Sequence, residues 1–299
     1  MSSLFLQKTC ATAKLQCLIK RKTPETRMTG KPNDKPSDWT IDQGWASYTP
    51  QEHAVWRTLY ERQTALLPNR ACAAFVDGMK HLPIEGSQIP DFRALNEVLM
   101  PQTGWQIVAV PGLVPDDVFF DHLANRRFPS GNFIRKPDQL DYLQEPDVFH
   151  DVFGHVPMLM NPVMADFIQA YGVGGLRAQS LGALELLARV YWYTVEFGLV
   201  RDDGGLRIYG AGIASSFSES VYALDSAVPQ RIRFDLQRVM RTLYRIDDLQ
   251  ETYFVLDSLD TLLGLAQTDF GPLYTDCLRH EPLKPGELDA ADTLINRSA

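Results

Sequence analysis

Two histidines lie close together in the segment EPDVFHDVFGHVPM, residues 145–158. Five positions separate His150 from His155, so a regular α-helix would place their imidazoles roughly 140° apart around its axis. Both rings can face one ion if the helix loosens at Gly154, just before Pro157 ends it. Each could instead be an ordinary core histidine, but two buried rings each need a polar partner. The pair is therefore a candidate metal-binding element.

A third ligand is expected from the segment YWYTVEFGL, residues 191–199. Glu196 lies there among aromatic residues, and burying a carboxylate in such surroundings is costly without a cation. That cation could be a metal ion or the guanidinium of Arg189. The residues alone leave both alternatives open.

Two imidazoles and one carboxylate can hold zinc with a water molecule, or Fe(II) with three open positions on one face. Zinc hydrolysis would use a glutamate base, but the chain has no H-E-x-x-H motif, and Asp151 is the only near substitute. The H-x-D motif of 2-oxoglutarate oxygenases is missing too. The spacing favours a metal-dependent enzyme, with iron ahead of zinc.

The elements that must hold these residues are predicted to be mainly helical. Thr49 as N-cap, Pro50 at the first helical position and Glu52 in a capping box indicate a helix that ends at Pro68. Apolar periodicity predicts further helices over 71–79, 91–100, 115–124, 183–199 and, with one or two breaks, 232–266. Short strands are expected at 105–112 and from 206, with no βαβ alternation. The expected fold class is mainly α with a few short β-strands, in one domain over 37–299.

Charge is distributed unevenly along the 299 residues. Residues 1–35 hold eight Lys/Arg and two Asp/Glu, whereas the remaining residues hold 21 Lys/Arg and 35 Asp/Glu. An acidic body argues against nucleic acid as the main partner. The basic tail, residues 1–36, is expected to be disordered, and translation that begins at Met28 would remove most of it.

The rest of the composition indicates a soluble cytoplasmic protein. The most apolar window, residues 181–200, is interrupted by charged side chains, so no membrane span is expected. The four cysteines form no C-x-x-C pair, which argues against a disulfide framework or a zinc ribbon.

Three motifs together resemble the pterin-dependent aromatic amino acid hydroxylases, and most closely their bacterial members that act on phenylalanine. The motifs are EPDVFHDVFGHVPML, YWYTVEFGL and YGAGIASSFSES, and the resemblance runs through most of residues 105–270. It implies the single-domain catalytic fold of that family. It also implies hydroxylation of L-phenylalanine to L-tyrosine with O₂ and a tetrahydropterin at a non-heme Fe(II).

The resemblance assigns the iron ligands to His150, His155 and Glu196. The segment VPGLVPDDVFF, residues 110–120, is similar to the pterin loop of the family. Six positions match pterin contacts: Gly112, Leu113, Val114, Phe119, Asp151 and Ala188. The animal enzymes have glutamate at the position of Asp151, so the shorter side chain is a departure from the family pattern.

Further positions match the substrate site of the family. Arg135 matches the arginine that binds the substrate carboxylate, and its guanidinium fork suits that task. The other matching residues are Tyr142, near the iron, and the ring walls Pro146, Trp192, Phe197, Gly212 and Ser215. Leu143 and Gln144 depart from the animal pattern Y-T-P-E-P-D, and a threonine hydroxyl is lost there. Asp147 is expected either to orient the imidazole of His150 or to carry a helix N-terminal charge.

Two alternatives stay open from the sequence. The same scaffold could hydroxylate tryptophan or tyrosine, or a non-catalytic relative could use it to sense a ligand. The chain is shorter than the animal relatives with their regulatory and tetramerising segments, so a monomer is expected.

Overall fold

The structure is a computed structural model that describes residues 38–141, 145–202 and 204–296. The predictions for the basic tail and for Tyr142, Leu143 and Gln144 fall outside these residues.

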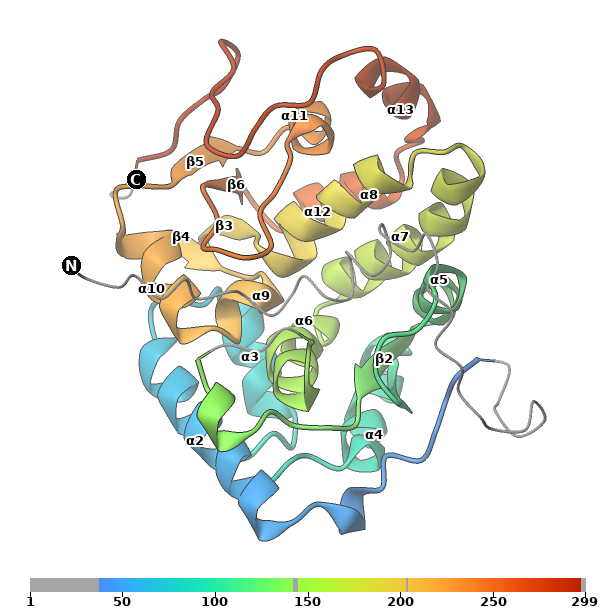
Figure 1. Ribbon diagram of the computed structural model, residues 1–299, viewed down its shortest axis with the longest axis vertical. Coiled ribbons are helices and arrows are strands. Elements are labelled where there is room, and N and C mark those ends of the chain that lie inside the picture. The colour runs from blue at the N-terminus through green and yellow to red at the C-terminus, as the bar shows by residue number, and fades with distance from the viewer. Residues whose placement is uncertain (1–37, 142–144, 203, 297–299) are drawn as a thin grey trace.

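Helices dominate the described chain and form the centre of Figure 1. The α-helices are α2 (Pro50–Leu66), α3 (Ala73–His81), α4 (Phe92–Thr103), α5 (Asp116–Ala124), α6 (Val156–Leu159), α7 (Pro162–Ser180), α8 (Leu184–Tyr191), α9 (Ala211–Ala214), α10 (Phe217–Asp225), α11 (Leu236–Arg241), α12 (Thr261–Ala266) and α13 (Gly271–Cys277). Two segments are π-helical, η3 (Phe149–His155) and η4 (Trp192–Glu196). Two are short 3₁₀ turns, η1 (Trp45–Ser47) and η2 (Pro137–Gln139).

Within the described residues, six strands form two sheets on different sides of the central helices, as Figure 1 shows. The strands are β1 (Gln106–Val110), β2 (Arg127–Gly131), β3 (Leu199–Asp202), β4 (Gly205–Ile208), β5 (Gln230–Arg233) and β6 (Thr252–Leu256). β1 and β2 pair in parallel. The other sheet has the order β4-β3-β6-β5, in which only the β3–β4 pair is antiparallel.

The predicted start of α2 is confirmed in detail. The Thr49 hydroxyl accepts the backbone N–H of Glu52, and the Glu52 carboxylate accepts the backbone N–H of Thr49 at 2.7 Å. This reciprocal pair satisfies two donors that a helix start leaves without partners. α2 then packs against η3, where the Trp56 ring meets the Phe149 ring edge-on at 5.3 Å.

The prediction of a helix with one or two breaks over 232–266 is wrong for the middle of that stretch, where a loop and β6 lie between α11 and α12. That stretch contains the end of β5, then α11, β6 and α12. All five residues of β6 are buried, and periodicity alone does not distinguish such a short, wholly buried strand from a buried helix. The expected absence of βαβ alternation is also wrong, because β1-α5-β2 and β5-α11-β6 each join parallel strands through a helix.

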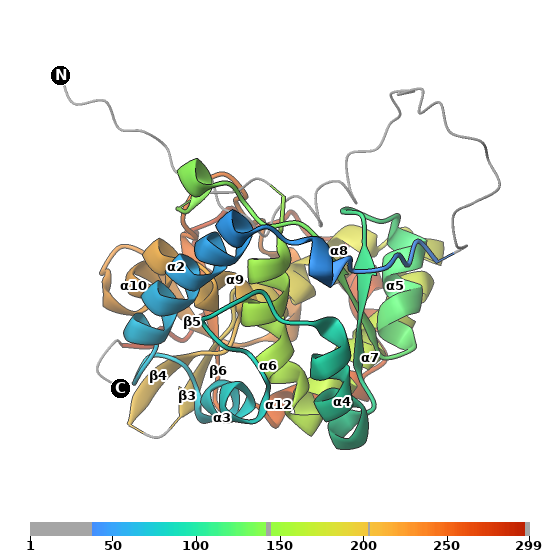
Figure 2. The same ribbon diagram turned by 90° about the horizontal axis from the view of Figure 1, so that it is seen from below.

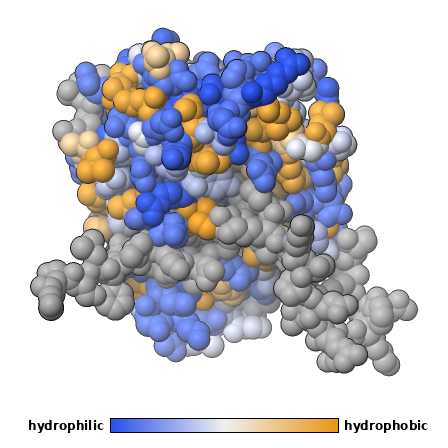
Figure 3. All heavy atoms as spheres, turned by 45° about the horizontal axis from the view of Figure 1, so that its top comes forward, coloured by the Kyte–Doolittle hydropathy of each residue, from blue (hydrophilic) through white to orange (hydrophobic). Residues whose placement is uncertain are grey.

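The buried apolar side chains form one cluster that reaches from α2 to α13. α7 runs through it with α5 at its side, as Figure 2 shows from below. On the face in Figure 3, hydrophobic residues are scattered among hydrophilic ones. Among the described residues, every helix is too short or too polar to cross a membrane.

Candidate active site and metal centre

The structure brings His150, His155 and Glu196 together in the core. The Nε2 atoms of the two histidines lie 3.2 Å apart. The Glu196 carboxylate lies 3.6 Å from Nε2 of His150 and 3.3 Å from Nε2 of His155. An ion about 2.1 Å from each ligand requires ligand atoms roughly 3.0–3.4 Å apart. The three buried side chains therefore fit one small metal ion.

The spacing of five between the histidines works because η3 is a π-helix. Its i→i+5 hydrogen bonds widen the turn and bring residues five apart closer to one face than a regular α-helix does. The predicted loosening ahead of Pro157 is confirmed and extends over seven residues. The prediction that Pro157 ends the helix is wrong, because α6 continues through it to Leu159 with the proline in its first turn, where a helix tolerates proline. Gly154 also lets α9 approach, since a Cβ there would lie 2.9 Å from the carbonyl oxygen of Ala211.

The hydrogen bonds of Ser215 indicate the tautomer of His150. The Ser215 hydroxyl donates to the carbonyl oxygen of Ala211 at 2.8 Å. Its oxygen lies 2.9 Å from Nδ1 of His150 and can accept that N–H. A proton on Nδ1 leaves the lone pair of Nε2 directed at Glu196 and His155, as a metal ligand requires.

Glu196 ends η4, in which the Phe197 N–H donates to the carbonyl oxygen of Trp192 at 2.8 Å. The alternative partner, Arg189, is engaged elsewhere. Its Nη1 donates to the carbonyl oxygen of Met240 at 2.6 Å, and its Nη2 lies 3.9 Å from Glu185. The structure therefore pairs Glu196 with the two histidines and not with that arginine.

Gly212, predicted as a substrate wall, lies against the Glu196 side chain. A Cβ at this position would lie 3.2 Å from Oε2 of Glu196 and 3.0 Å from Cζ of Phe197. Any larger residue would thus push on the ligand or on the neighbouring ring. The missing side chain leaves room for the carboxylate to keep its place.

Arg135 and Asp147 form a buried, two-point ion pair. Nε and Nη2 of Arg135 donate to the two carboxylate oxygens of Asp147 at 2.8 and 2.9 Å. Asp147 also accepts the backbone N–H groups of Arg135 and His150. Burial works to raise the pKa of Asp147, but the charge and hydrogen bonds of Arg135 outweigh burial and lower it.

The expected contact between Asp147 and the imidazole of His150 is not what the structure shows. Asp147 accepts the backbone N–H of His150 at 3.1 Å, whereas Nδ1 of the ring contacts Ser215. The alternative, a carboxylate at a helix start, describes this geometry. Asp147 therefore orders the backbone that carries His150, and Ser215 orients the ring.

The predicted pterin loop follows β1 and is tied to the start of the metal-binding segment. Gly112 has φ = 146°, and a Cβ there would lie 2.7 Å from Oε1 of Glu145. The N–H of Leu113 donates to the same oxygen at 3.3 Å. The positive φ favours glycine at 112. The hydrogen bond from Leu113 to Glu145 holds the loop beside the start of the metal-binding segment. Val114, the next residue, is half-buried against the core.

Aromatic rings connect this loop with the metal centre. Phe119, on α5, meets the ring of Tyr191 edge-on at 6.2 Å, and Tyr191 lies 6.4 Å from the ring of His155. Asp151 is fully buried and accepts the N–H of Gly131 at 2.9 Å, which ties η3 to β2. The remaining predicted pterin position, Ala188, is buried on α8.

The predicted walls of the substrate ring are buried. The rings of Trp192 and Phe197 lie 4.6 Å apart at 33°. Pro146 is buried just ahead of η3. Ser215 is also buried, and its hydrogen bond to His150 gives it a second role beyond that of a wall.

Sequence reasoning missed several residues that pack on this site. The Phe128 ring lies 4.8 Å from that of His155. Tyr244 stacks on Trp192 at 4.2 Å, and the Gln250 carboxamide accepts the Trp192 indole N–H at 2.9 Å. No spacing in the sequence marks them, because they come from elements distant along the chain.

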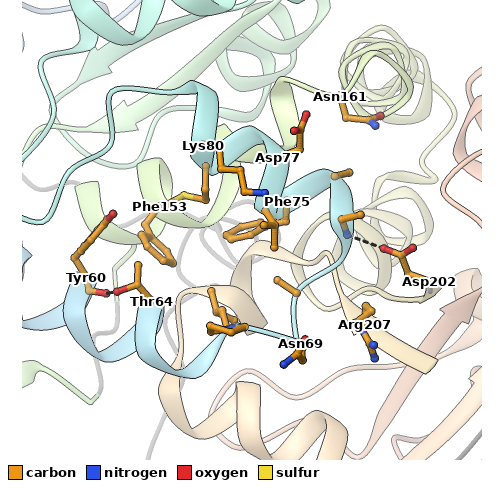
Figure 4. Close-up of a pocket in the computed structure, with 17 residues that line it drawn as sticks. Tyr60, Thr64, Asn69, Phe75, Asp77, Lys80, Phe153, Asn161, Asp202 and Arg207 are labelled. Atoms are coloured by element: carbon orange, nitrogen blue, oxygen red, sulfur yellow. Dashed lines mark hydrogen bonds between the residues drawn. The ribbon is translucent and has the colours of Figure 1, made fainter. Parts of the chain in front are cut away.

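A separate groove of about 1040 Å³ lies between α2, α3 and the β3–β4 strands, as Figure 4 shows. The carboxylate of Asp202 closes one side by accepting the N–H of Ala73 at 2.6 Å. Phe153 of η3 reaches the groove, but the three candidate metal ligands do not line it. The groove is therefore distinct from the metal centre.

Comparisons with known proteins agree with this geometry. Residues 43–267 match the family described as biopterin-dependent aromatic amino acid hydroxylase. The chain is 61% identical to phenylalanine-4-hydroxylase of Caulobacter vibrioides over 90% of this chain and 91% of that protein. It is 56% identical to the Chromobacterium violaceum enzyme over 87% of this chain and 88% of that protein.

Solved structures of the Chromobacterium violaceum enzyme are similar over the same region. The form described as bound to iron and phenylalanine has a TM-score of 0.83 at 54% identity, covering 87% of this chain and 94% of that one. The cobalt-bound form has a TM-score of 0.85 at 56% identity, covering 87% and 95%. Together with the family match, these relatives establish that the chain belongs to the biopterin-dependent aromatic amino acid hydroxylases.

Proposed function

We propose that this protein hydroxylates L-phenylalanine to L-tyrosine, using O₂ and a tetrahydropterin at a non-heme Fe(II). The observation that carries the proposal is the buried set of two imidazoles and one carboxylate on neighbouring π-helical turns. Such a set leaves one face of an Fe(II) ion open. Relatives that are 61% and 56% identical to it over the matched residues are phenylalanine-4-hydroxylases.

His150, His155 and Glu196 would hold the iron. When bound, the iron and the pterin supply the electrons and the open coordination positions that O₂ needs for hydroxylation of an aromatic ring. The protein contributes the geometry. Ser215 keeps Nε2 of His150 unprotonated, and the apolar rings of Trp192 and Phe197 exclude water from the reacting centre.

The pterin would lie between the loop at Gly112–Val114 and the ring of Phe119, with Asp151 and Ala188 on the side of the metal. Glu145 supports this arrangement because it holds the loop backbone in place. Arg135 would bind the substrate carboxylate. Its guanidinium is oriented in advance by Asp147, so little side-chain entropy is lost when an anion binds.

The aromatic ring of the substrate would lie among Pro146, Trp192, Phe197 and Gly212. We further infer a single catalytic domain over 37–299 that acts as a cytoplasmic monomer without a nucleic-acid partner. Light scattering of the purified chain tests the monomer directly.

The test of the proposed function is metal reconstitution. Protein stripped with a chelator should regain tetrahydropterin-dependent tyrosine formation with Fe(II) and not with Zn(II). Equal activity with zinc, or no tyrosine with iron and pterin, would contradict the proposal. Competition among phenylalanine, tyrosine and tryptophan then identifies the preferred ring.

A further inference from the structure

The buried side-chain amide of Gln250 is hydrogen-bonded to the indole of Trp192. Oε1 of Gln250 accepts the indole N–H at 2.9 Å, and Nε2 of Gln250 donates to the carbonyl oxygen of Arg245 at 2.9 Å. Tyr244, from the same loop, stacks on the indole at 4.2 Å with 15° between the planes. The loop between α11 and β6 therefore fixes both the edge and the face of Trp192.

Gln250 is in turn held by Glu219 of α10. Oε1 of Glu219 accepts the backbone N–H of Gln250 at 3.2 Å and also the hydroxyl of Tyr253. Oε2 of Glu219 has no hydrogen-bond partner among the described residues. The side chain is fully buried, and no described cation forms an ion pair with it.

A carboxyl in such a place is costly to ionise, and burial raises the pKa of Glu219 to about 7. An apolar residue would avoid this cost. It would, however, leave the N–H of Gln250 and the hydroxyl of Tyr253 buried without an acceptor. The carboxyl oxygen thus supplies a contact that the loop needs.

The orientation of Trp192 is also coupled to the metal centre. Its carbonyl oxygen accepts the N–H of Phe197 at 2.8 Å across η4, and its ring packs on the Phe197 ring at 4.6 Å. Glu196 lies between these two residues in the chain. A shift of the indole would therefore move the wall beside a candidate iron ligand.

We propose that Gln250 and Glu219 are positioning residues for the reaction: Gln250 fixes the indole of Trp192, and the carboxyl of Glu219 fixes Gln250. This inference rests on the proposed function, in which Trp192 is a wall of the phenylalanine site. A loosened wall binds phenylalanine less well and allows the pterin to be oxidised without hydroxylation of the substrate.

Four variants test the inference. Gln250→Leu and Glu219→Leu remove the contacts, whereas Glu219→Gln keeps a carbonyl-type oxygen for Gln250 and Tyr253. Gln169→Leu is the matched control, because the Gln169 amide also bridges two groups, accepting from Nε of Arg126 at 2.9 Å and donating to the carbonyl oxygen of Ala124 at 3.1 Å. It lies on α7, outside the contacts of Trp192.

Gln250→Leu and Glu219→Leu should each raise KM for phenylalanine by about tenfold, the effect of losing roughly one buried hydrogen bond. Both should also lower the amount of tyrosine formed per pterin oxidised. Glu219→Gln and Gln169→Leu should stay near the wild type in both quantities. Unchanged KM and coupling in both leucine variants, or equal losses in Gln169→Leu, would overturn the inference.

A second measurement does not depend on turnover. The chain has five tryptophans, and ¹⁵N-labelled protein gives one indole N–H signal for each. Trp192→Phe identifies the signal of Trp192 in iron-free full-length protein. Gln250→Leu and Glu219→Leu should shift this signal and speed its exchange with solvent, whereas Glu219→Gln and Gln169→Leu should not.

The two measurements separate the inference from the proposed function. If the wild type forms no tyrosine, the proposed function fails, and the indole signal alone decides whether Gln250 and Glu219 hold Trp192. If the wild type is active but the indole signal is unmoved in both leucine variants, only the positioning role is overturned.

Discussion

His150 and His155 present their Nε2 atoms 3.2 Å apart although five positions separate them in the chain. A regular α-helix would direct the two rings roughly 140° apart. The π-helical turn that aligns them is supported from behind by Phe149 and Phe153, whose rings stack at 4.9 Å, and by Trp56. The metal centre therefore depends on the packing of the core as well as on its ligands.

Glu196→Gln should abolish tight iron binding and reduce tyrosine formation by at least about 100-fold, because a neutral amide is a poor ligand for Fe(II). Metal analysis after dialysis measures the iron per chain. Glu185→Gln is the control, since that glutamate is exposed and only faces Arg189. Full iron stoichiometry in Glu196→Gln would show that this carboxylate is not a ligand.

Ser215→Ala should weaken iron binding by about 10- to 100-fold, since the imidazole of His150 would lose the partner that sets its tautomer. Competition with a chelator gives the affinity. Ser218→Ala removes a nearby hydroxyl whose one hydrogen bond among the described residues is to Ser216, and it should leave the affinity unchanged. An iron affinity in Ser215→Ala equal to the wild-type value would remove Ser215 from the metal centre.

Asp147→Asn should lower the free energy of unfolding by roughly 3–5 kcal/mol at pH 7, because it leaves the Arg135 guanidinium buried without its counter-charge. The pKa of Asp147 is lowered in the folded state. Its contribution is therefore fully present above the ordinary value of 3.8 and is lost as the pH falls further.

Urea unfolding of the wild type and Asp147→Asn at several pH values measures this difference. It should be constant near neutrality and shrink only below about pH 4. Asp141→Asn, at an exposed partner of Arg62, is the control and should cost at most about 1 kcal/mol. A difference that already disappears near pH 6 would contradict the assignment to Asp147.

Glu219 should make the free energy of unfolding depend on pH in the sense opposite to Asp147. Its pKa is raised from 4.5 to about 7, so the folded state holds the proton that the unfolded chain releases. The wild type should lose about 3 kcal/mol relative to Glu219→Gln as the pH rises from 4.5 to 7, and nothing further above that.

Thermal or urea unfolding of both proteins between pH 4.5 and 8 provides the check. If the free energies of unfolding of the wild type and Glu219→Gln change in parallel with pH, Glu219 titrates normally. A relative loss of wild-type stability toward low pH would contradict the sign of the shift.

The sequence was most informative where chemistry is local. Residue type and spacing made His150, His155 and Glu196 candidate ligands, and the family resemblance assigned them to iron. The spacing of five between the histidines predicted the loosened turn before Pro157. Capping chemistry at Thr49 likewise located the start of α2. Periodicity failed over 232–266, because β6 is buried on both faces and shows no alternation.

The sequence by itself determined the ligand types, their family resemblance and the mainly helical class, since these follow from residue identity and short-range pattern. Only the tertiary structure decided that Ser215, and not Asp147, contacts the His150 ring, and that Arg135 is oriented by Asp147. It also brought Glu219 and Gln250 behind Trp192. These partners lie 12 to 65 positions apart, and packing of distant elements brings them together without any local pattern.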